Sequence, residues 1–167
     1  MHQRRLLHKL FSLLSGLFIL TALLFTSCTG SGADLSHAET LLETNPAAAD
    51  SILTNMPMPT RHRDRAWYAV LKTQADYKQY KPITSDSLIL TATDYYSAHR
   101  KSYRSAMAWY SQGCVYSELN NDLGAVDAFF KAEDLFPDTL VRYYALAEKN
   151  LGTHYLNRMM LNEAKQQ

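Results

Sequence analysis

The side chains that could do chemistry in this chain are few and scattered. The six histidines and two cysteines, which belong to the residue types that bind metals, do not pair with one another at metal-site spacings. The sequence also has no glycine-rich phosphate loop, no serine nucleophile elbow and no histidine–carboxylate motif of a protease. We therefore expect no metal, no cofactor and no catalytic residues, and the protein is predicted not to be an enzyme.

A basic and then apolar amino terminus ends at Cys28. Residues 1–9 carry only positive charges, residues 10–25 are mostly apolar, and small residues come directly before the cysteine. This order is similar to the signal of bacterial lipoproteins, in which the cysteine is acylated and holds the protein to a membrane. We predict a signal peptide over residues 1–27, lipidation at Cys28 and a short flexible tether over residues 28–34.

The alternative is an uncleaved membrane anchor. The apolar run 10–25 would rise about 24 Å as a helix, less than the roughly 30 Å of a hydrocarbon core, although the uncharged stretch continues to Ala33. The lipoprotein pattern is also imperfect, because Phe25 stands where leucine is usual. If Cys28 is acylated, Cys114 has no disulfide partner, and we expect it to be a small packing residue rather than a reactive thiol.

Helix signals follow one another along the mature chain, and no alternating run typical of a strand occurs. Ser36 and Glu39 have the spacing of a capping box that begins a helix, and Asn45-Pro46 closes this helix and opens the next. Apolar residues then recur every three or four positions over residues 63–78. The pattern predicts an all-α protein.

The second half continues in the same way. Residues 102–119 and 123–135 are predicted as two helices joined by a short polar turn. Asp138 is expected to cap a long helix that ends near Tyr155, and Met160 is expected to begin another.

Glycine, alanine and aromatic residues recur at fixed spacings in this half. The clear set comprises Trp109, Gly113, Tyr116, Ala125, Phe129, Ala132 and Pro137. The same Gly-x-x-Tyr spacing returns 39 residues later at Gly152 and Tyr155, with an alanine twelve residues after each glycine. Small residues let antiparallel helices approach closely, and aromatic side chains fill the space between neighbouring pairs. We predict a complete helix–turn–helix repeat over residues 106–139 and a partial repeat over residues 145–167.

This unit resembles a tetratricopeptide repeat, departing from the pattern where Gln112 replaces the usual leucine. The whole chain is similar to the tetratricopeptide-repeat lipoproteins of Bacteroidota. The resemblance implies that residues 35–167 form helix–turn–helix repeats that stack as a short right-handed solenoid. In the family, partners lie in a groove lined by the first helix of each pair. Carried over to this chain, the implied partner-binding residues are Met107, Tyr110, Cys114, Ser117 and Glu118.

The charge balance argues against a nucleic-acid partner. The leader holds three of the 17 basic residues, which leaves 14 basic against 16 acidic residues in the mature chain. Phosphate binding needs a clustered cationic surface, which this chain lacks. In chaperone-binding members of the family, a terminal carboxylate is clamped by lysine and asparagine, and here Tyr110 and Cys114 occupy two such places. We therefore expect a partner peptide or helix rather than an anion.

The function predicted from these observations is a non-enzymatic scaffold, tethered to a membrane by lipid, that binds a partner protein in a helical groove. An outer-membrane location facing the periplasm is expected in preference to surface display, because the residues after Cys28 are neutral. One alternative is the input half of a regulatory protein. A third is a glycan-binding lipoprotein, for which the eleven tyrosines would supply stacking surfaces, although tyrosine is also ordinary packing in repeat helices.

Overall fold

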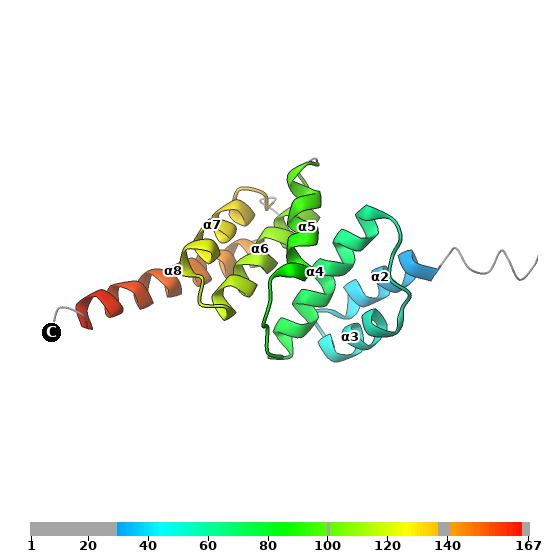
Figure 1. The fold of residues 1–167 in the computed structure, drawn as a ribbon, viewed down its shortest axis with the longest axis horizontal. Coiled ribbons are helices and arrows are strands. Elements are labelled where there is room, and N and C mark those ends of the chain that lie inside the picture. The colour runs from blue at the N-terminus through cyan, green and yellow to red at the C-terminus, as the bar shows by residue number, and fades with distance from the viewer. Residues whose placement is uncertain (1–29, 100, 137–140, 165–167) are drawn as a thin grey trace, which may run out of the picture.

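The computed structural model describes residues 30–99, 101–136 and 141–164 (Figure 1). Within these ranges the chain forms seven α-helices and no strand, which confirms the all-α prediction. The helices are α2 (Gly30–Leu41), α3 (Pro46–Asn55), α4 (His62–Lys78), α5 (Ser87–Ser97), α6 (Tyr103–Glu118), α7 (Asp122–Glu133) and α8 (Val141–Ala164). The predicted signal peptide, Cys28, Pro137 and Asp138 lie outside the described residues.

The helices follow one another along the longest axis of the molecule, from α2 and α3 at one end to α8 at the other (Figure 1). Each helix packs against the next in sequence, and α4 also contacts both α2 and α6. The C-terminal half of α8 extends beyond the other helices (Figure 1). No helix in the described ranges is both long and apolar enough to cross a membrane.

Several helix starts follow from local sequence. The Asn45 side chain accepts a hydrogen bond from the Ala48 amide at 3.1 Å, and Pro46 occupies the first turn of α3, as predicted. Ser102 and Ser105 form a reciprocal capping box at α6. In the turn between α6 and α7, the Asn121 side chain accepts from the Gly124 amide at 3.1 Å. These caps fix where α3, α6 and α7 begin.

The start of α2 differs from the prediction. Because α2 begins at Gly30, residues 30–34 are helical, whereas a flexible tether was expected there. Ser36 and Glu39 therefore lie inside the helix and do not form a capping box. The Glu39 carboxylate instead accepts a hydrogen bond from the Trp67 indole at 3.0 Å. Leu35, directly before Ser36, is buried, so α2 already contacts the core before the expected cap.

The last described helix, α8, also differs from the prediction. A break between Tyr155 and Met160 was expected, but α8 continues through this segment as one helix of 24 residues. The segment contains neither glycine nor proline, so nothing in its local sequence opposes helix.

The core supports the steric interpretation of the repeat motif. A Cβ atom placed on Gly113 would lie 2.5 Å from the Phe129 ring, so only glycine permits this approach of α6 and α7. Phe129 is fully buried, as are the alanines of α7 that face α6. Between α4 and α6, the Gln74 amide donates to the Ser111 hydroxyl at 2.9 Å in a buried contact. The apolar core thus also contains a buried hydrogen bond that joins α4 to α6.

Candidate functional site

The predicted partner-binding residues of α6 do not lie together on an open surface. Met107, Tyr110 and Cys114 are buried, whereas Ser117 is half-buried and Glu118 is exposed. The Tyr110 ring packs against Phe129 and Phe136, with ring centroids 5.8 and 6.4 Å apart. Three of the five predicted groove residues therefore belong to the core between neighbouring helices, which corrects the prediction that they face a groove.

Burial also determines the chemistry of Cys114. Desolvation raises the pKa of its thiol to about 12, although hydrogen bonds with Tyr110 and Tyr77 act in the opposite direction. The thiolate is the reactive form of cysteine, and its fraction at neutral pH is then negligible. Cys114 is a buried packing residue, as the sequence indicated.

A hydrogen-bonded chain of three side chains, which the sequence did not reveal, joins α8 to the last turn of α6 and the first residue of α7. The Ser117 hydroxyl lies 2.7 Å from His154 Nε2, and His154 Nδ1 lies 3.1 Å from an Asp122 carboxylate oxygen. The signal that could have indicated this contact is the 39-residue offset, which aligns His154 with the buried Val115. The position of α8 that corresponds to buried Val115 thus carries a polar side chain, and such a side chain needs hydrogen-bond partners.

This order of serine, histidine and aspartate is also that of a hydrolase triad. Ser117 lies in the last turn of α6, however, where its hydroxyl also donates to the Gly113 carbonyl at 2.9 Å. The amides of Leu119, Asn120 and Asn121 donate to helix carbonyls, so they are not free to stabilise an oxyanion. The arrangement is better suited to holding α8 in place than to attacking an ester.

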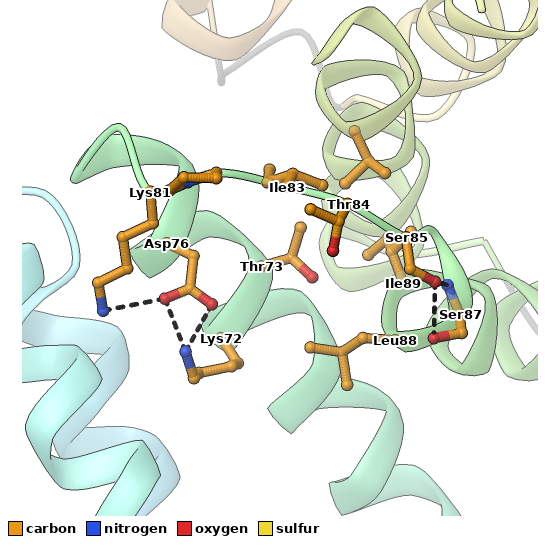
Figure 2. A pocket seen from close by; sticks show the side chains of 12 residues that line it. Lys72, Thr73, Asp76, Lys81, Ile83, Thr84, Ser85, Ser87, Leu88 and Ile89 are labelled. Atoms are coloured by element: carbon orange, nitrogen blue, oxygen red, sulfur yellow. Dashed lines mark hydrogen bonds and ion pairs between the residues drawn. The ribbon is translucent and has the colours of Figure 1, made fainter. Parts of the chain in front are cut away.

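A cavity of about 380 Å³ lies under the loop between α4 and α5 (Figure 2). It is lined by Lys72, Thr73, Asp76, Lys81, Pro82, Ile83, Thr84, Ser85, Ser87, Leu88, Ile89 and Val115. Figure 2 shows the Thr73 side chain pointing from α4 toward the loop that carries Thr84. The Ser85 hydroxyl accepts from the Ser87 amide at 3.2 Å and so holds the loop at the start of α5.

Two lysines and two aspartates form a compact ion cluster at one side of this cavity. Lys72 contacts Asp50 at 2.9 Å and Asp76 at 2.5 Å, and Lys81 contacts the same two carboxylates at 2.5 and 3.1 Å. Burial alone would raise the pKa of Asp50, but hydrogen bonds from Lys81 and Lys72 outweigh it and hold the pKa below its ordinary value. Because the four charges cancel, the cavity offers hydroxyl groups and apolar walls rather than a net charge.

A second cavity of about 380 Å³ lies where α5, α6 and α7 meet. The Lys131 ammonium lies 4.5 Å from the centroid of the Trp109 ring, and both residues line this cavity together with Asp134. Charges of both signs again border the space. Within the described residues, no group of three histidine, cysteine, aspartate or glutamate side chains is placed to hold a metal ion.

The C-terminal half of α8 carries exposed apolar side chains. Tyr155, Leu156 and Met159 are 52%, 62% and 60% exposed. With Gly152 they recur at i, i+3, i+4 and i+7, which places all four on one side of the helix. Ala147 and Leu151, on another side of α8, are buried. The helix therefore has two apolar sides, of which one is covered.

No family model, curated protein or solved structure matches this chain. The resemblance to tetratricopeptide-repeat lipoproteins therefore depends on the sequence pattern alone and stays a prediction.

Proposed function

We propose that this chain is a non-enzymatic binding scaffold in which tetratricopeptide-like helical hairpins stack as a short right-handed solenoid and hold a partner protein. The observation that carries the proposal is the packing order, in which each helix contacts the next and α4 also contacts α2 and α6. Stacked hairpins pack in this way, and proteins built from them use the resulting long surfaces to bind other chains.

The proposed partner is a peptide segment or a helix. The two cavities are bordered by charges of both signs, and the cluster of Lys72, Lys81, Asp50 and Asp76 has no net charge. Such surfaces suit an uncharged or amphipathic segment better than a polyanion. Because Met107, Tyr110 and Cys114 are buried, the proposal depends on accessible surfaces rather than on these three residues.

The membrane tether is part of the same proposal. Lipid on Cys28 would concentrate the scaffold at a membrane, with the outer membrane facing the periplasm as the proposed location. Replacing Cys28 with alanine is expected to release the chain from the membrane fraction and to abolish labelling by a fatty-acid analogue. A variant that stays in the membrane fraction would instead indicate an uncleaved anchor.

The experiment that tests binding is photocrosslinking from membranes of cells that express the full chain, followed by identification of the crosslinked protein. A crosslinking amino acid at exposed Glu118 or Tyr80 is expected to capture a defined partner. The same amino acid at buried Met107, which has no access to a partner, is the control. Equal yields at buried and exposed positions would contradict specific binding.

The non-enzymatic character is tested separately at Ser117. A fluorophosphonate probe reacts with activated serine nucleophiles, and the proposal predicts no labelling that depends on both Ser117 and His154. Labelling that disappears in Ser117→Ala and in His154→Ala would show that the chain of hydrogen bonds activates the serine, and the protein would then be a hydrolase.

A further inference from the structure

We propose that the cavity under the loop between α4 and α5 binds a small zwitterion, namely a free α-amino acid with an aliphatic side chain. This inference goes beyond the proposed function, because it assigns a small-molecule site to a chain that is proposed to hold a protein. It is carried by three features of the cavity, which are a buried hydroxyl group, a cluster of charges on one side and apolar walls on the other (Figure 2).

The buried hydroxyl group belongs to Thr73. This residue is only 5% exposed and lines the cavity, and its side chain points from α4 toward the loop (Figure 2). No described residue forms a hydrogen bond with the Thr73 hydroxyl. A buried polar group without a partner is unfavourable, so a ligand that hydrogen-bonds to this hydroxyl would be stabilised in the cavity.

The charged groups Lys81 and Asp76 each have capacity for one more partner among the described residues. An ammonium group has three donors, and the Lys81 ammonium uses two of them, on Asp50 at 2.5 Å and on Asp76 at 3.1 Å. A carboxylate accepts about four hydrogen bonds, and Asp76 receives one from Lys72 on each oxygen and a third from Lys81. One donor and one acceptor of neighbouring groups therefore remain.

A free α-amino acid matches this arrangement of charge. Its ammonium and carboxylate groups are attached to the same carbon atom, so they can reach Asp76 and Lys81 at the same time. Charge-assisted hydrogen bonds of this kind are the stronger ones in proteins. Because a zwitterion has no net charge, it also leaves no unpaired charge beside the neutral cluster.

The loop holds Lys81 in position before any ligand binds. The Lys81 amide donates to the Asp76 carbonyl at 3.1 Å, and the preceding residue, Tyr80, has a φ of 55° in the left-handed region. The backbone thus turns sharply at Tyr80, and the Lys81 side chain reaches the carboxylates of Asp50 and Asp76. A ligand would then not have to order the lysine, which lowers the entropic cost of binding.

The size and walls of the cavity define the rest of the ligand. The volume of about 380 Å³ lies near the lower end of the range of about 300–1,000 Å³ that is typical of ligand pockets, which suits one small molecule. Figure 2 shows Leu88 and Ile89 on the side away from Lys81. Ile83 and Val115 complete the apolar lining. An amino acid with its charged end at Lys81 would place an aliphatic side chain against these walls.

The test is isothermal titration calorimetry of the full chain in detergent micelles with L-leucine, for which we expect saturable binding. Leucine amide lacks the carboxylate and isocaproate lacks the ammonium group, so each should bind at least tenfold more weakly. Alanine should bind roughly tenfold more weakly, because it buries less apolar surface. No saturable binding of leucine, or equal binding of leucine and any of these three compounds, would overturn the inference.

Substitution of Thr73 shows where leucine binds. Thr73→Val keeps the shape of the side chain and removes a hydroxyl group that has no described partner, so the stability of the fold should not fall. Leucine should bind this variant roughly tenfold more weakly, because a charged group of the ligand loses a hydrogen bond. Unchanged binding would overturn the inference.

Thr93→Val is the matched control. Thr93 is also buried, but it does not line this cavity, and its hydroxyl donates to the carbonyls of Ile89 and Leu90 at 3.5 and 3.4 Å. Leucine binding should not change in this variant. Equal weakening by Thr73→Val and Thr93→Val would show that the effect does not come from the cavity, and would overturn the inference.

The outcomes for leucine and for the partner protein are independent. If leucine fails to bind while a crosslinker at Glu118 still captures a partner, the scaffold function stands and the small-molecule site does not. If leucine binds and no partner is captured, the small-molecule site stands and the scaffold function fails.

Discussion

The helices α6 and α8 share a Gly-x-x-Tyr sequence but have opposite surroundings. Around Gly113 the side chains of α7 close in, and Phe129 is fully buried against the glycine. Around Gly152 the space is open among the described residues, and the apolar side chains that follow it are more than half exposed. The same Gly-x-x-Tyr spacing is thus closely packed in α6 and, among the described residues, openly exposed in α8.

The difference shows what the motif specifies. Glycine lowers helix stability, so its presence in a helix needs a packing reason, and Gly113 has one. Gly152 has the same cost and no described contact that offsets it. The comparison therefore separates two effects of glycine. One is its low helix propensity, which applies to both helices, and the other is the close packing of a neighbouring ring, which applies to Gly113. Substitutions can test each effect.

The largest effect is expected from Gly113→Leu. Three atoms of the Phe129 ring lie within 3 Å of the position of the new Cβ atom, so α6 and α7 must separate. We expect a loss of about 3 kcal/mol or more in the free energy of unfolding. Urea denaturation followed by circular dichroism measures it. A midpoint equal to that of the wild type would mean that α7 does not press on Gly113.

Tyr110→Ala is expected to cost almost as much. Tyr110 is 5% exposed and packs between Phe129 and Phe136, so truncation leaves a cavity worth about 3 kcal/mol. Tyr110→Phe keeps the ring and should cost much less, which makes it the matched control. Thermal unfolding measures the stability of both variants. Weaker partner capture by Tyr110→Ala at unchanged stability would restore Tyr110 as a groove residue and contradict its place in the core.

Local signals in the sequence predicted most of the helical framework, because they act within one or two turns. The apolar spacing over 63–78 predicted α4 to within one residue, and Asn45 caps α3 as expected. The site was harder to predict because burial depends on distant neighbours. The expectation that Cys114 is a small packing residue agrees with its burial, but the resemblance had also assigned Cys114 and Tyr110 to a groove, and both are buried. The Tyr110 ring packs against Phe129 of α7.

The role of His154 was missed for a related reason. Its partners Ser117 and Asp122 are more than 30 residues away, so no local spacing signals the contact. The register of α8 against α6 decides which residues meet, and that register is set by the packing of whole helices.

A smaller effect is expected from the link that fixes the covered side of α8. Ser117→Ala, His154→Ala and the double variant form a cycle, and we expect a coupling energy of about 1 kcal/mol between the two side chains. Denaturation midpoints give the change in the free energy of unfolding for each of the three variants. Thr153→Ala, at an exposed neighbour of His154, controls for changes in α8 alone. Additive effects would show that the 2.7 Å contact contributes nothing to holding α8.

The smallest effect, of opposite sign, is expected from Gly152→Leu in the isolated chain. No described atom lies within 4 Å of the new Cβ position, so the substitution meets no steric cost. Leucine also favours helix over glycine, and the free energy of unfolding should rise by up to about 1 kcal/mol. The same change thus destabilises α6 and stabilises α8, because among the described residues an aromatic ring presses on Gly113 and no atom lies near Gly152. A loss of stability comparable to that of Gly113→Leu would mean that another part of the chain already covers Gly152, and the comparison between the two helices would fail.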